Sequence, residues 1–323
     1  MKHFLKTLLA LMLALCTVFT VTACDGGNED NTTTSADGGT TTEEEETTTE
    51  EEETTTEEET TTVENVVVTP PTRAEMVADL EELNVLALGD SLFYGAYETI
   101  GDKVWVNMLG LECGWHLTNL GVGGMTVSLT ANNAVAGNAS MYDRLFNTTT
   151  YHYGSNVDSR YYNCGYAQWK TAEEVDVILL EGGCNDYGYK IAAPLGTVES
   201  KDPATFLGAW NVITEKLLQD YPNAIIIFIT PWELNGSQTR PDNMTSIEFS
   251  TSIVTLYEEV YADNDRIYLI DAGDPEVSGV NMKDSTWKNE YSYDNYHLKE
   301  NGMTVMAESM LPLIWDIVVN QAQ

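Results

Sequence analysis

Three side chains in this sequence have the types and spacing needed for nucleophilic catalysis. Ser91 follows a short apolar run at residues 85–88 and stands in a Gly-Asp-Ser-Leu motif. A serine nucleophile needs a base, which is nearly always histidine. Asp294 precedes His297 by three residues, close enough for the carboxylate to reach the imidazole and fix its tautomer. The pattern therefore predicts Ser91 as nucleophile, His297 as base and Asp294 as the triad acid.

These residues also allow other interpretations. His3 lies in an N-terminal leader, His116 opens a predicted strand and His152 lies in a tyrosine-rich segment, so each fits the role of base less well. Asp90 and Ser91 also suit the cap of a helix, as Asp and Ser often do. Because Ser91 has a candidate base elsewhere in the chain, we favour catalysis and interpret Asp90 as a turn residue.

Two further turns offer hydrogen-bond donors to the oxyanion of an acyl transfer. Asn119–Gly124 follows a predicted strand, and its glycines allow backbone N–H groups to approach a ligand. Gly182–Asp186 follows the strongest predicted strand and offers the side-chain amide of Asn185. Each turn alone is typical of a tight strand exit. Together with Ser91 they follow successive strands, whose carboxyl ends collect ligands in parallel sheets.

The elements that must position these residues follow an α/β pattern. Short apolar runs alternate with longer helical patterns, which predicts a parallel sheet with helices packed on it. The predicted strands cover residues 84–89, 116–121, 175–181, 224–230 and 267–271.

Three helices are well marked. The first is predicted to start at Asp202-Pro203, a cap followed by proline, and the second at about Thr245. The third follows Leu298, and Pro312 predicts a kink or a break in it. The faces expected to be buried carry Phe206, Trp210, Ile213 and Leu217 in the first, Ile253, Leu256, Tyr257 and Val260 in the second, and Met303, Met306, Ala307, Met310 and Ile314 in the third.

Four motifs in order resemble the SGNH hydrolases, also called GDSL-type lipases or esterases. Residues 89–92 are similar to the first block, 119–124 to the second, 183–186 to the third and 294–297 to the last. The resemblance covers roughly residues 80–320. It implies a flavodoxin-like, three-layer α/β/α sandwich with a central, mainly parallel five-stranded sheet.

The resemblance also assigns the oxyanion donors. It implies a backbone donor at Gly124, with Gly121 or Gly123 as alternatives, and a side-chain donor at Asn185. Leu298 stands where many members have proline, which removes no catalytic group.

Cysteine and histidine give little further chemistry. Cys113, Cys164 and Cys184 form an odd set in the globular part, so no complete disulfide framework exists, and a Cys113–Cys164 bridge is left open. Cys184 departs from the family, whose members usually carry a small residue there. No two Cys or His residues have ligand spacing, so we expect no metal and no cofactor.

The N-terminus predicts export. Residues 1–23 resemble a signal peptide, and the following Cys24 completes a sequence similar to the lipobox of bacterial lipoproteins. This implies lipidation of Cys24, with ordinary secretion as the alternative. Residues 24–73 are rich in Thr and Glu and are expected to form a disordered stalk before the hydrolase domain, residues 74–323.

Charge excludes some partners. The 323 residues hold 15 Lys+Arg and 51 Asp+Glu, a formal net charge of -36. This balance argues against nucleic acid and against electrostatic attraction to anionic lipid, so contact with a membrane is expected through the lipid anchor only. The oligomeric state is left open.

The substrate is predicted from the position of aromatic residues. Tyr94, Tyr187, Trp232 and Trp287 lie near predicted strand ends and could form a rim for sugar rings, or belong to the core. With a surface stalk, this favours a serine esterase that deacetylates polysaccharide or short-chain esters outside the cell. An O-acetyltransferase acting on a glycan and a non-catalytic surface binding protein are the alternatives. Residues 131–170 are either a substrate-binding excursion or a surface insertion.

Overall fold

The computed structural model describes residues 70–129, 140–146, 174–188, 192–232, 240 and 242–322. The predicted signal peptide, Cys24 and nearly all of the predicted stalk lie outside these residues, as do most of residues 131–170. Contacts divide the chain into two units, residues 1–66 and 67–323, and the description below concerns the second.

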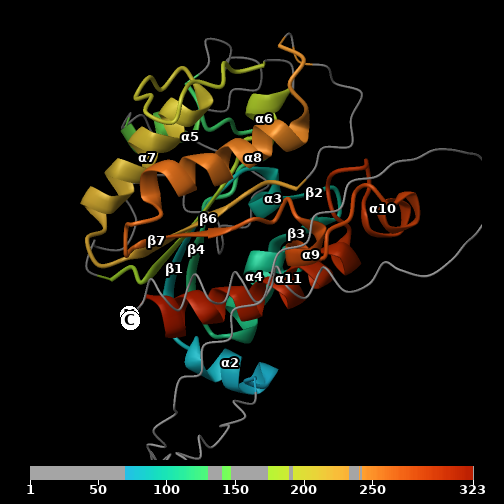
Figure 1. Ribbon diagram of the computed structural model, residues 1–323. Coiled ribbons are helices and arrows are strands. Elements are labelled where there is room, and N and C mark those ends of the chain that lie inside the picture. The colour runs from blue at the N-terminus through green and yellow to red at the C-terminus, as the bar shows by residue number, and fades with distance from the viewer. Residues whose placement is uncertain are drawn as a thin grey trace, which may run out of the picture. The chain divides into compact units, whose positions relative to one another are not determined.

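A five-stranded parallel sheet forms the centre of this unit (Figure 1). The strand order is β4-β1-β5-β6-β7, the order of flavodoxin-like sheets. The first strand lies inside the sheet, the second is added on one side of it, and the remaining three are added on the other side. The predicted α/β class and parallel sheet are confirmed. The strands are β1 (Asn84–Leu88), β4 (His116–Asn119), β5 (Val177–Glu181), β6 (Ile225–Ile229) and β7 (Ile267–Ile270).

Helices cover both faces of the sheet, which explains why the strands are apolar throughout. In β1, Val85 and Ala87 belong to one apolar layer, whereas Leu86 and Leu88 belong to the other. Figure 1 shows one group of helices on each side of the strands. The first layer packs on α2 (Arg73–Asp79), α4 (Trp105–Glu112) and α11 (Glu300–Trp315), and the second on α5 (Met141–Phe146), α7 (Phe206–Asp220) and α8 (Ser246–Leu256).

The first predicted helix begins three residues later than expected. Asp202 caps only a turn, because its carboxylate accepts from the Ala204 N–H at 3.0 Å. The N-cap of α7 is Thr205, whose hydroxyl accepts from the Gly208 N–H at 3.2 Å. The buried face of Phe206, Trp210, Ile213 and Leu217 is as predicted.

The second predicted helix starts as expected and ends differently. Thr245 is its N-cap and forms a capping box with Glu248. After Leu256 the chain continues as a π-helix, η4 (Tyr257–Tyr261). Because a π-helix adds a residue to each turn, the face rotates. Val260 is therefore 43% exposed, so its predicted burial is wrong.

The third predicted helix continues through Pro312. The predicted break does not occur there: α11 reaches Trp315 and is followed by a π-helix, η5 (Asp316–Gln321). Leu311 and Ile314 on either side of the proline are buried, and this packing offsets the backbone hydrogen bond that proline cannot donate. Residues 300–321 are long and apolar enough to span a membrane, but the same apolar face is part of the domain core.

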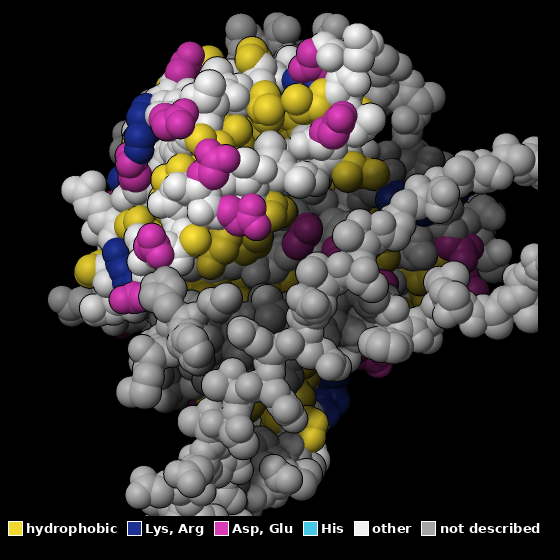
Figure 2. All heavy atoms as spheres, viewed as in Figure 1, with side chains coloured by type: hydrophobic (Ala, Val, Ile, Leu, Met, Phe, Trp, Pro, Cys, Tyr) yellow, Lys and Arg dark blue, Asp and Glu magenta, His cyan; other side chains and the backbone are white. Residues whose placement is uncertain are grey.

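The face in Figure 2 carries acidic side chains spread between apolar patches, in keeping with the negative formal charge of the chain.

Short elements surround the carboxyl edge of the sheet. The short elements are α3 (Ser91–Tyr94), β2 (Gly95–Ala96), β3 (Thr99–Ile100), η1 (Gly101–Lys103), α6 (Cys184–Tyr187), α9 (Pro275–Ser278) and α10 (Ser285–Tyr291).

Candidate active site

Ser91 is the first residue of α3 and lies just beyond the end of β1. Asp90 caps this short helix, because its Oδ1 accepts from the Leu92 N–H at 3.0 Å. Phe93 is fully buried and packs edge-on against Trp105 of α4, with 5.4 Å between ring centroids. The serine is thus held between a capped turn and a buried aromatic contact.

Ser91, His297 and Asp294 lie in one hydrogen-bonded row. His297 Nε2 is 2.9 Å from Ser91 Oγ, and His297 Nδ1 is 2.7 Å from Asp294 Oδ2. The other oxygen, Oδ1, accepts from the backbone N–H of His297 at 2.8 Å. This loop turns at Asn295, whose φ is +68°. The arrangement allows the ring to take the serine proton while the carboxylate stabilises the resulting charge.

The carboxylate of Asp294 stays ionised. Partial burial acts to raise its pKa, but hydrogen bonds from the ring and backbone of His297 and from the Tyr97 hydroxyl outweigh burial. The pKa of Asp294 is therefore held well below its usual range. The Tyr97 hydroxyl donates to Oδ2 at 3.0 Å, a contact that the sequence analysis missed.

Asn119 links the second motif to the nucleophile helix. Its side-chain nitrogen donates to the Phe93 carbonyl at 2.8 Å, and its side-chain oxygen accepts from the Gly121 N–H at 2.8 Å. The Gly121 N–H is therefore already hydrogen-bonded, and a side chain at residue 121 would collide with the backbone of Tyr94. Gly124 is exposed with a φ of +77°, and no described residue accepts from its N–H, so the geometry favours it over Gly121 as a donor.

Asn185 lies on α6, at the end of β5. Its amide nitrogen donates to the Met125 carbonyl at 2.9 Å and to Asp90 Oδ2 at 3.2 Å. The next residue, Asp186, is fully buried and accepts from the N–H groups of Val127 and Ser128 at 2.8 and 2.9 Å. These contacts fix the third motif to the loop that carries Gly124.

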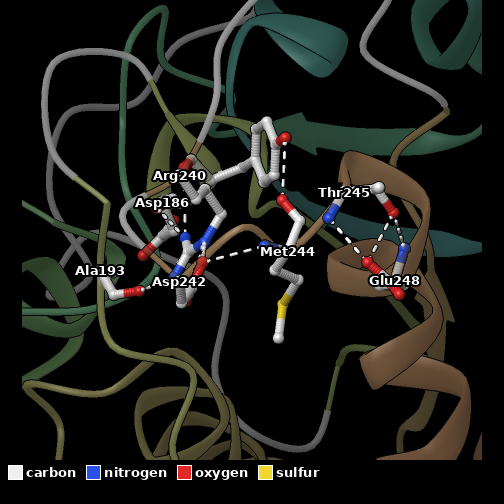
Figure 3. A network of polar contacts seen from close by, with 8 residues as sticks. Asp186, Ala193, Arg240, Asp242, Met244, Thr245 and Glu248 are labelled. Carbon is white, nitrogen blue, oxygen red and sulfur yellow. Dashed lines mark hydrogen bonds and ion pairs between the residues drawn. The ribbon is translucent and has the colours of Figure 1, made fainter.

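Arg240 binds the backbone at the end of α6 (Figure 3). Its guanidinium is nearly inaccessible to solvent and donates to the carbonyls of Asp186, Tyr187 and Ala193 at 3.3, 3.1 and 2.7 Å. Two nitrogens also donate to the carboxylate of Asp242. This arginine, which no sequence motif indicated, supplies donors to two carbonyls of α6 and to the Ala193 carbonyl, and the Asp186 carbonyl also accepts from the Ala193 N–H at 2.9 Å.

Two buried carboxyl groups lie directly behind Ser91. The Asp90 N–H donates to Glu181 Oε2 at 3.2 Å, and the Cys184 thiol donates to Asp90 Oδ2 at 2.7 Å. Burial, together with the neighbouring Asp90 charge, raises the pKa of Glu181 well above its usual value. Burial also raises the pKa of Asp90 and of the Cys184 thiol.

The predicted aromatic rim is wrong for two of its four members. Tyr187 and Trp232 are buried, and the Trp232 indole donates to the Tyr296 carbonyl at 2.9 Å. Tyr94 and Trp287 are half-buried. Side chains near strand ends were the only available signal, and the fold turns two of them inward.

Exposed aromatic rings at the site come instead from Tyr97 and Tyr293, which are 62% and 38% exposed. Neither directly follows a strand of the large sheet, so no pattern in the sequence indicated them.

The remaining candidates lie elsewhere. His116 pairs with Glu82 on the surface, 3.0 Å apart, and His152 lies outside the described residues. Cys113 carries a free, buried thiol, and Cys164, its partner in the bridge left open above, lies outside the described residues. Leu298, which stands where many SGNH hydrolases have proline, is fully buried and plays a packing role.

Fold and site together are those of a serine ester hydrolase of the SGNH type: a three-layer sandwich with a Ser–His–Asp row at the carboxyl edge of its sheet. Residues 87–305 match the model of the GDSL-like lipase/acylhydrolase family. The chain therefore belongs to that family. Comparison with curated proteins gives no match.

Solved structures with TM-scores above 0.5 share the fold. One is 21% identical with a TM-score of 0.57 and covers 75% of this chain and 99% of its own. A protein from Lactobacillus plantarum is 18% identical with a TM-score of 0.53, and the match covers 72% of this chain and 97% of that protein. A family two carbohydrate esterase from Clostridium thermocellum, in complex with cellohexaose, is 14% identical with a TM-score of 0.49, covering 72% and 64%.

Proposed function

We propose that the enzyme hydrolyses carboxylic esters through an acyl-enzyme on Ser91. The observation that carries this proposal is the 2.9 Å contact between Ser91 Oγ and His297 Nε2, with Asp294 2.7 Å from the opposite ring nitrogen. His297 takes the serine proton as Oγ attacks the ester carbonyl carbon. The protonated ring then gives that proton to the leaving alkoxide, and the C–O bond breaks.

The tetrahedral oxyanion is held by three donors in this proposal: the N–H groups of Ser91 and Gly124 and the side-chain amide of Asn185. No described residue accepts from the Ser91 N–H. Asp90 accepts from the next three N–H groups of α3, those of Leu92, Phe93 and Tyr94. The Asn185 amide makes its longer bond, 3.2 Å, to Asp90, and this is the N–H that we expect to turn to the oxyanion. Water activated by His297 then deacylates the enzyme.

Two variants test the assignment. Ser91→Ala should abolish hydrolysis of p-nitrophenyl acetate and labelling by a fluorophosphonate probe. Asn185→Ala should still be labelled, with kcat lower by about 10²–10³, the cost of losing one oxyanion donor. Circular dichroism checks that both variants fold. Ordinary esterase activity in Ser91→Ala would overturn the proposal.

For the substrate, we propose acetylated polysaccharide or short-chain esters. Support comes from the signal-like N-terminus and the Thr/Glu-rich stalk, which suit an enzyme that acts on polymers outside the cell. Acetate release from acetylated xylan should exceed hydrolysis of long-chain p-nitrophenyl esters. Product analysis with an acceptor glycan present separates hydrolysis from acetyl transfer. Preference for long acyl chains would contradict the proposal.

For the location, we propose that Cys24 is lipidated and anchors the enzyme to the outside of the cell membrane. The support is the lipobox-like sequence before Cys24. Metabolic labelling with a fatty-acid probe should mark the wild type and not Cys24→Ala. The variant should move from the membrane fraction to the medium. Labelling that survives in Cys24→Ala would overturn the anchor.

A further inference from the structure

Tyr97 has a backbone conformation that its side chain disfavours. The antiparallel pair β2–β3 joins Ala96 to Thr99, so Tyr97 and Glu98 form a two-residue loop. Tyr97 has a φ of +56°, in the left-handed region that glycine occupies most easily. Backbone strain of this kind persists where the surrounding structure holds it, and it clusters at functional sites.

The strained loop presents an exposed ring beside the triad. The Tyr97 ring lies 4.8 Å from the Tyr293 ring and 6.0 Å from the His297 ring, between centroids. Tyr293 is tied to the same hairpin, because its hydroxyl is 3.1 Å from Thr99 Oγ1. Its backbone N–H donates to the His297 carbonyl at 2.9 Å, which joins it to the catalytic loop. We call Tyr97 and Tyr293 the tyrosine pair.

The tyrosine pair lies beside His297, the residue that protonates the leaving oxygen in the proposed reaction. His297 must protonate the leaving oxygen, so the alcohol part of the ester has to approach its ring. The Asn185 amide bonds to Asp90 and Met125, whereas the Tyr97 hydroxyl bonds to Asp294 in the row that orients His297. An alcohol group that reaches His297 therefore meets the exposed rings of the pair.

We propose that the tyrosine pair is the subsite for the alcohol part of the ester, and that this alcohol is a sugar ring. Tyrosine offers a rigid, apolar face with a polar tip at low conformational cost. A sugar has the matching form, since the C–H face of a pyranose can lie on the rings while its hydroxyls stay in water. This inference rests on the proposed hydrolysis at Ser91 and names the substrate class of that site.

The test compares a sugar acetate, methyl-xyloside acetate, with an alkyl acetate, ethyl acetate. Tyr97→Gly and Tyr293→Leu should lower kcat/KM for the sugar ester about tenfold more than for the alkyl ester, chiefly by raising KM. Tyr97→Phe keeps the ring and should keep the sugar preference. Its kcat should fall by the same factor on both esters, because the bond to Asp294 is lost in both reactions.

Stability provides a second measurement. Glycine adopts a positive φ without strain, so Tyr97→Gly should melt at the same or a higher temperature than the wild type while it loses sugar preference. Phe146→Leu is the control: Phe146 is 39% exposed and stacks on Tyr142 in α5, which packs on the other apolar layer. It should leave both activities unchanged.

The outcomes separate the two proposals. A wild type that hydrolyses neither acetate would overturn the proposed hydrolysis and this subsite with it. A wild type that hydrolyses both esters while Tyr97→Gly loses the same factor on each would overturn the subsite alone, leaving Tyr97 as a positioning residue for Asp294.

Discussion

The Asn185 side-chain amide donates to Asp90 Oδ2 at 3.2 Å, which connects the third motif to the residue directly before Ser91. The same oxygen also accepts from the Cys184 thiol, and the other oxygen caps α3. Asp90 is thus more than a turn residue, because one carboxylate positions both the nucleophile helix and the candidate oxyanion amide.

Replacing Asp90 with Asn should therefore impair turnover. An amide has one oxygen to accept hydrogen bonds, and the N–H of Leu92 and the amide of Asn185 would compete for it. We expect kcat to fall by about tenfold to a hundredfold with little change in KM, since misplacement by 1 Å carries a cost of that order. Steady-state kinetics on p-nitrophenyl acetate measures this. The exposed Asp263→Asn is the control, and wild-type kcat in Asp90→Asn would contradict the expectation.

Glu181→Gln should change how stability depends on pH. The pKa of buried Glu181 is raised in the folded protein. Its contribution to stability is therefore fully present below its unfolded pKa, about 4.3, and is lost as pH rises through the folded pKa. Glutamine carries no charge at any pH. Urea unfolding at pH 5 to 8 should show that the free energy of unfolding of the variant increases relative to that of the wild type as pH rises. A difference independent of pH would mean that Glu181 does not titrate differently on folding.

Asp294→Asn should give the opposite pH effect and a loss of activity. The pKa of Asp294 is lowered, so its contribution to stability is present above the unfolded pKa, about 3.9, and disappears as pH falls. The wild type should therefore lose more stability than the variant below pH 4. An amide cannot hold the His297 tautomer, and kcat should fall by roughly 10³–10⁴. Thermal melts from pH 2 to 7 and kinetics at pH 8 check both effects.

Arg240→Lys should destabilise the domain. A lysine has one ammonium group and cannot reproduce the contacts to three carbonyls and both carboxylate oxygens of Asp242. The lost contacts are hydrogen bonds from a buried, charged guanidinium, and losing them should cost about 2–3 kcal/mol in free energy of unfolding. Arg73→Lys is the matched control, because Arg73 pairs with Glu112 at the surface and should cost less than about 1 kcal/mol. Equal losses in the two variants would contradict the role of Arg240.

The sequence determined the architecture because its signals are local. Strands buried on both faces are continuous apolar runs, and Thr245 with Glu248 marks a helix start within four residues. The motif positions also followed from the chain alone, since a Gly-Asp-Ser after an apolar run has to lie at a strand end. The physical reason is that backbone geometry and burial are encoded over a few neighbouring residues.

Tertiary structure decided the contacts between segments far apart in the chain. Nothing near Glu181 in the sequence shows that its carboxylate meets Asp90, and nothing near Tyr97 shows that its hydroxyl reaches Asp294, 197 residues later. The direction of a side chain such as Trp232 was equally undetermined, because a strand end can turn it inward or outward. Such contacts depend on how layers pack, and packing joins residues irrespective of their separation in sequence.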